Sequence, residues 1–120
     1  GNVVGDFGLE THPRFGTQVR NDGIDISVPV GTAVRAVAKG RVDAADEDYG
    51  GAGGLVVINH GDGYYTIYSH LSEVSVSNGA EVPAGAVIGR SGEEGSLKGP
   101  SLHFEVRKGS APLNPSSWLR

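Results

Sequence analysis

The sequence carries a small set of side chains that could bind a metal or move a proton. Its four histidines are His12, His60, His70 and His103. Residues 99–109 alternate like a β-strand, which places four polar side chains on one face: Ser101, His103, Glu105 and Arg107. His70 and His103 together with Asp25 would suit zinc, which accepts imidazole and carboxylate ligands together. Spacing alone does not show that these side chains converge.

Each of these residues also has a structural interpretation. His12 precedes a proline in a loop-like segment, and His60 ends a strand ahead of a glycine, where a histidine commonly donates to the backbone. We therefore expect structural roles for both, and His70 or His103 taken alone also fits one. Arg107 is the best equipped of the set for bidentate recognition of a carboxylate, and an ordinary solvated arginine is the alternative.

Composition limits the classes of protein to consider. A chain of 120 residues is expected to form one domain. The absence of cysteine excludes disulfides, thiolate zinc sites and a cysteine nucleophile. A net charge of −4 argues against nucleic acid as a partner, and no apolar run is long enough to span a bilayer. The chain opens abruptly without a visible signal peptide, so we expect it to be the C-terminal part of a longer protein.

The elements that must position these side chains are short strands. The 20 glycines are not periodic, and β-branched runs lie between them, which is typical of tight turns joining strands. Strands are predicted over residues 24–28, 32–38, 41 onward, 54–61, 63–71, 85–91 and 101–107, with a hairpin turn at Asp62-Gly63. The apolar run at 54–61 predicts a central strand covered on both faces, and Trp118 is expected to dock on the body. Segments 28–42 and 76–90 echo each other, by chance or as a duplicated β-motif. The predicted fold is an all-β, antiparallel β-sandwich.

Three segments, residues 21–42, 54–92 and 99–119, together resemble the lysostaphin-like (LytM) zinc endopeptidase domain, which cleaves peptide crosslinks in bacterial cell walls. The Tyr-x-His-Leu and Leu-His-Phe-Glu-Val motifs, in this order with these glycine turns, are specific to it. The resemblance runs from about Thr11 to Leu119. It implies that residues 1–120 form a single LytM domain with the antiparallel sandwich of that family.

The site residues that the resemblance implies are incomplete in this chain. Active members have His-x-Gly-x-Asp, whose His and Asp bind zinc; here Asp25 is present but Asn21 replaces the His. The Tyr-x-His motif is kept, which assigns His70 the catalytic-assisting position. In the final His-x-His motif, Ser101 replaces the catalytic His, and His103 keeps the ligand position.

These two replacements predict a site that binds no metal and performs no hydrolysis. An amide oxygen from Asn21 is a poor third zinc ligand. A serine hydroxyl has no pKa near neutrality, so Ser101 cannot act as an imidazole does. We therefore expect no cofactor, vestigial ligand positions at Asn21, Asp25 and His103, and vestigial catalytic positions at His70 and Ser101. The old cleft is expected to serve as a groove for a partner, lined by Asn21, Asp25, His70, Ser101, His103, Glu105 and Arg107.

The C-terminal segment, residues 99–119, looks most like the murein hydrolase activators of the EnvC type. That resemblance implies a non-catalytic domain in the periplasm of a bacterium, which binds and activates cell-wall amidases or another murein hydrolase during daughter cell separation. A signal peptide and a coiled coil would then lie upstream. Two alternatives stay open. One is a module that binds peptidoglycan or an assembly partner without activating it. The other is a residual zinc endopeptidase in which His12 or a water replaces the missing ligand.

Overall fold

The computed structural model describes residues 2–5, 7–11, 18–48, 53–93 and 99–118. For residues 2–5, 9–11, 18–21 and 116–117 it describes the backbone alone. The expectations for His12 lie outside the described residues, as does the side chain of Asn21. No helix in the described ranges has the length and hydropathy needed to cross a membrane.

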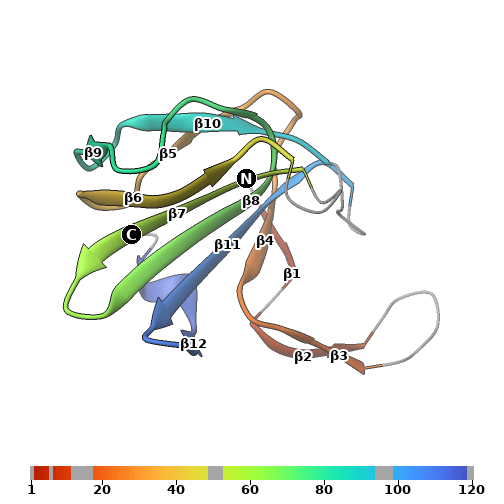
Figure 1. Ribbon diagram of the computed structural model, residues 1–120. Coiled ribbons are helices and arrows are strands. Elements are labelled where there is room, and N and C mark those ends of the chain that lie inside the picture. Colours follow the sequence, from red (N-terminus) through yellow and green to blue (C-terminus); the bar gives the residue numbers. More distant parts are fainter. Residues whose placement is uncertain (1, 6, 12–17, 49–52, 94–98, 119–120) are drawn as a thin grey trace.

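The described residues form short strands and one turn of 3-10 helix (Figure 1). In chain order these are β1 (Asn2–Gly5), β2 (Gly8–Thr11), β3 (Gln18–Asn21), β4 (Ile24–Ser27), β5 (Ala33–Arg35), β6 (Gly40–Asp46), β7 (Gly54–Gly61), β8 (Tyr64–Val74), β9 (Glu81–Val82), β10 (Val87–Ser91), β11 (Ser101–Lys108), β12 (Ala111–Leu113) and η1 (Pro115–Trp118).

The strands pair in the order β1-β4-β11-β8-β7-β6-β9, and every pairing between described strands is antiparallel. Strand β10 joins this sheet through the far end of β8 and pairs with β5 on its other side, while β12 pairs with β11. Figure 1 shows β5 and β10 lying over the main sheet and the β2–β3 hairpin projecting away from it. The all-β antiparallel prediction is thus confirmed. The two layers belong to one hydrogen-bonded sheet, however, because β8 takes part in both.

The two echoing segments pair with each other. Strand β5 pairs with β10, and β6 pairs with β9. The loops between them continue this pattern, since Ala36 N donates to Ala86 O (2.9 Å) and Gly85 N donates back to Ala36 O (2.8 Å). In the same way, Val42 N donates to Ala80 O (2.8 Å) and Gly79 N donates to Val42 O (2.7 Å). The two echoing segments therefore lie against each other in the fold.

The core lies between these layers. It is built from apolar side chains that each leave less than a tenth of their surface exposed: Ile24, Val34, Ala36, Val42, Val56, Ile58, Tyr68, Leu71, Val82, Ile88, Phe104 and Val106. The rings of Tyr68 and Phe104 meet at 5.3 Å. Burial of this apolar area is the main driving force for the fold.

A chain of polar side chains, buried at Thr66 and Tyr68, links β7 to β8. His60 Nδ1 donates to Lys39 O (2.8 Å), and its Nε2 lies 2.7 Å from Thr66 Oγ1. Thr66 Oγ1 is in turn 2.9 Å from the Tyr68 hydroxyl, which accepts from Val37 N (3.2 Å). Burial raises the pKa of Tyr68 despite these hydrogen bonds. The structural role expected for His60 is confirmed.

Individual elements match the sequence to different degrees. Strand β7 has the predicted bounds, and the turn before β8 has the positive φ angles of a tight hairpin, 54° at Asp62 and 82° at Gly63. Trp118 docks as expected, with its ring 5.6 Å from those of His60 and Tyr64. Full coverage of β7 on both faces was wrong: its side chains alternate between buried and half-buried positions, because only one face meets the core.

Candidate functional site

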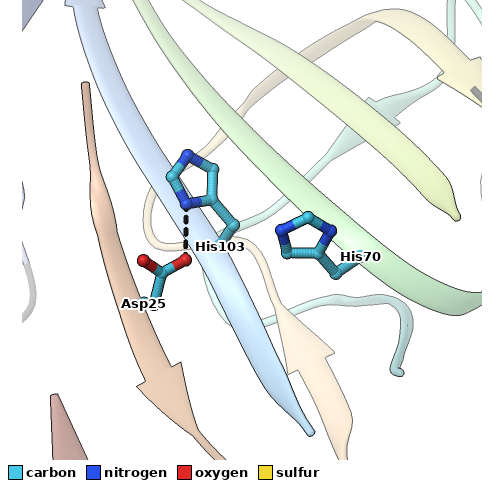
Figure 2. A group of neighbouring side chains, drawn as sticks. All are labelled: Asp25, His70 and His103. Atoms are coloured by element: carbon cyan, nitrogen blue, oxygen red, sulfur yellow. Dashed lines mark hydrogen bonds and ion pairs between the residues drawn. The ribbon is translucent and has the colours of Figure 1, made fainter. Parts of the chain in front are cut away.

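Three neighbouring strands bring Asp25, His70 and His103 together. Strand β11 lies between β4 and β8, so that His103 stands opposite Asp25 on one side and Ser69 on the other. One ligand atom from each of the three residues lies within 4.8 Å of the others. Figure 2 shows the three side chains side by side, with His103 bonded to Asp25. We call these three residues the histidine cluster.

His70 reaches the cluster because β8 bends at this residue. Its φ is 64°, a left-handed conformation that residues other than glycine rarely adopt. The pairing with β7 shifts here, since Gly54 faces Leu71 while Leu55 faces Ser69, leaving His70 as the extra residue of a bulge. Bulges commonly redirect a side chain next to a functional site. Here the His70 ring comes to lie 5.7 Å from that of His103, centroid to centroid.

His103 is held between two carboxylates. Its Nδ1 lies 2.7 Å from Asp25 Oδ1, and its Nε2 lies 2.9 Å from Glu105 Oε2. Burial alone would lower the pKa of His103, but the hydrogen bonds and charges of Asp25 and Glu105 outweigh it and raise the pKa to about 9. At neutral pH His103 is therefore an imidazolium that donates from both ring nitrogens.

Glu105 connects this imidazolium to Arg107. Arg107 donates to Glu105 Oε1 from both Nε (3.0 Å) and Nη2 (2.7 Å), and its Nη2 also lies 3.6 Å from Asp22 Oδ2. Burial raises the pKa of Glu105, but its bonds to His103 and Arg107 outweigh that effect and lower it. The face predicted for residues 103, 105 and 107 is thus a continuous charged row. We expected the Arg107 guanidinium to be available for a partner's carboxylate, but it already binds the carboxylate of Glu105.

Ser101, one of the two replaced positions, has a buried side chain. Ser101 leaves none of its surface exposed, and its backbone bridges to Gly92. A partner therefore cannot touch the Ser101 side chain without moving its neighbours, which differs from its expected place in a groove wall. The backbone of Asn21 ends β3 opposite Gly8.

The histidine cluster has the donor types that zinc accepts. Two imidazoles and a carboxylate are the donor set of many catalytic zinc sites. Zinc bonds of about 2.0–2.1 Å in a tetrahedron would hold neighbouring ligand atoms roughly 3.3 Å apart. His103 Nδ1 and Asp25 Oδ1 are 2.7 Å apart, a distance that suits a shared proton. For zinc to bind here, this hydrogen bond would have to open.

The surface of the described residues is hollowed beside His70 and around His60. One, of about 380 Å³, is lined by Val30, Glu47, Leu71, Ser72, Gly92 and Glu93 and lies directly beside His70 in the sheet. The other, of about 560 Å³, is lined in part by Lys39, Arg41, His60 and Glu81, and shares no residue with the histidine cluster. The smaller hollow is the one next to the cluster. Nothing in the spacing of Val30, Glu47 and Glu93 along the sequence could have revealed it.

A family profile and the curated relatives both place the chain in one protein family. The sequence profile of Peptidase family M23 matches residues 19–115. The chain is 42% identical over 115 residues to the DD-carboxypeptidase/endopeptidase Mpg of Neisseria meningitidis, covering 96% of this chain and 26% of that protein. It is 38% identical over 110 residues to the murein hydrolase activator EnvC of Escherichia coli (88% and 26%), and 37% identical over 107 residues to the cell division protein DipM of Caulobacter vibrioides (89% and 17%). The chain thus spans about a quarter or less of each relative.

Solved structures agree with the fold. A zinc-containing peptidase from Vibrio cholerae superposes with a TM-score of 0.83 at 34% identity, covering 94% of this chain and 35% of that one. A chain from the SpoIIQ–SpoIIIAH pore-forming complex superposes with a TM-score of 0.81 at 32% identity, covering 98% and 82%. Both catalysis and assembly therefore occur among proteins similar to this one.

Proposed function

The chain belongs to peptidase family M23, and we propose that it is a non-catalytic member that binds and activates cell-wall amidases during daughter cell separation. The observation that carries this proposal is the bonding of His103. Its ring nitrogens lie 2.7 and 2.9 Å from carboxylate oxygens, so a metal would have to displace a proton and the bond to Asp25 before it could bind His103.

The replaced family positions support the same conclusion independently. With Asn21 and Ser101 in place of two histidines, the chain has neither the family's third zinc ligand nor its catalytic imidazole. Similarity to EnvC, whose name states the activation of murein hydrolases, supports a role through contact with another protein. The amidase substrate lies in the cell wall, so we place the domain in the periplasm of a bacterium.

A residual zinc endopeptidase is the second candidate. It is favoured by the 42% identity to Mpg and by the two imidazoles and one carboxylate of the histidine cluster. For this activity, the Asp25–His103 bond would have to open and His103 would have to lose a proton. A module that binds peptidoglycan or a partner without activation is distinguished from the main proposal by the experiment below.

Dye release from labelled cell walls tests the proposal. The purified domain is mixed with walls alone, and with each cell-wall amidase of the bacterium that encodes the chain. We expect no release by the domain alone and a severalfold gain with at least one amidase. Metal analysis of the same preparation should find far less than one zinc per chain. Release by the domain alone that disappears with a chelator and with His103→Ala would establish the endopeptidase instead. Binding without any gain would indicate the simple binding module.

A further inference from the structure

The hollow beside His70 has two large apolar residues, Val30 and Leu71, in its lining. Leu71 directly follows His70 and is 2% exposed, while Val30 is 53% exposed, the larger value of the two exposed large apolar side chains in the described ranges. Gly92 closes the side toward the histidine cluster, where a Cβ atom would lie 2.8 Å from His70 O. We call this hollow the Val30 pocket.

The rim of the Val30 pocket is acidic. Glu47 and Glu93 both line it and are both exposed, and neither has a hydrogen bond or ion pair within the described part of the chain. Asp46 and Asp48, next to Glu47, are exposed as well. No lysine or arginine is among the lining residues. An apolar floor with exposed carboxylates at its edge is complementary to an apolar side chain flanked by cations.

We propose that the Val30 pocket receives a segment of the partner amidase that carries an apolar side chain between lysine or arginine residues. This inference rests on the proposed function and adds the chemistry of the contact. The apolar side chain covers Val30 and Leu71, while its basic neighbours meet Glu47 and Glu93. An acidic segment would face like charges, and so would a second copy of this chain, whose net charge is −4.

Two pairs of variants test the contact, each with a matched control elsewhere on the surface. Val30→Asp is compared with Val87→Asp, because Val87 is the other exposed large apolar residue (39%) and does not line the pocket. The double change Glu47→Lys and Glu93→Lys is compared with Glu73→Lys and Glu81→Lys, which alters the net charge equally at two residues that do not line the pocket. Circular dichroism and thermal unfolding verify that each variant folds.

Affinity for the amidase that responds to the wild type is measured at low and at physiological salt. We expect Val30→Asp and the pocket double change each to weaken binding by at least about tenfold, with effects under about twofold for both controls. The pocket double change should also flatten the salt dependence. Wild-type binding that all four variants keep would overturn the inference and leave the proposed function standing. If no amidase binds the wild type, the proposed function fails, and the inference fails with it. Self-association that Val30→Asp abolishes would assign the pocket to a second copy.

Discussion

The charge on His103 predicts an unusual dependence of stability on pH. Its pKa rises from 6.5 to about 9 in the folded state, because the hydrogen bonds to Asp25 and Glu105 outweigh burial. The side chain is 17% exposed, so solvent screens these contacts only in part. A pKa of about 9 in place of 6.5 corresponds to about 3 kcal/mol of unfolding free energy.

The sign follows from which state binds the proton. Because the folded protein holds it more tightly, this stability is fully present below pH 6.5 and is lost as the pH rises through about 9. We expect the unfolding free energy, measured by urea titration with a chelator present, to fall by about 3 kcal/mol between pH 6 and pH 9.5. NMR of the His103 ring should report the pKa directly.

Glu105→Gln tests the assignment to this residue. The change removes one of the two carboxylates, so the pKa of His103 should fall and the pH dependence should shrink. At pH 6 we expect a loss of roughly 1.5–3 kcal/mol, the usual contribution of a hydrogen bond to a charged group. Glu81→Gln is the control, because the Glu81 residue is exposed and its side chain has no hydrogen bond or ion pair within the described residues. A His103 that titrates near 6.5 in the wild type would refute the reasoning. So would stability that rises with pH, the behaviour of a bound metal competing with the proton.

Three further predictions concern the bend, the polar chain and the replaced positions. Glycine adopts the positive φ angle of residue 70 without strain, whereas valine does not. We therefore expect the unfolding free energy of His70→Val, measured by urea titration, to be about 1–3 kcal/mol lower than that of His70→Gly. Thr66→Val should lower the unfolding free energy by about 1–3 kcal/mol, because it leaves the Tyr68 hydroxyl and His60 Nε2 without their shared partner; an unchanged urea midpoint would contradict this. The double change Asn21→His and Ser101→His should bring zinc to about one per chain in metal analysis while dye release stays low, and a variant that remains metal-free would mean that the cleft has rearranged.

Much of the fold could be predicted because period and turn chemistry are local properties. Strand β7 and the Asp62-Gly63 turn follow directly from β-branched runs and glycine. Strand β9, with two residues, and strands β1 to β3, with four each, are too short to show a period. The sequence also did not predict that β8 joins both layers. At this point β8 bends at His70, a left-handed residue that is not glycine.

The sequence predicted which residues share the candidate site better than it predicted how their side chains are bonded. Alternation along β11 indicated that His103, Glu105 and Arg107 share a face, and the structure joins them by hydrogen bonds. Alternation could not show that the Glu105 carboxylate accepts hydrogen bonds from both His103 and Arg107, because these bonds depend on the side-chain rotamers. Nor could it show the burial of Ser101, which depends on the segment at Gly92 that packs against it.

Strand β8 has a consequence for how the molecule comes apart. One continuous backbone of 11 residues hydrogen-bonds to β7, β11 and β10, so neither layer can swing away by parting side chains alone. Ladder bonds must break along with the apolar contacts, which ties the two layers into one cooperative unit. Amide protons in β10 and in β7 should therefore exchange with deuterium through the same global opening, rather than through separate local ones.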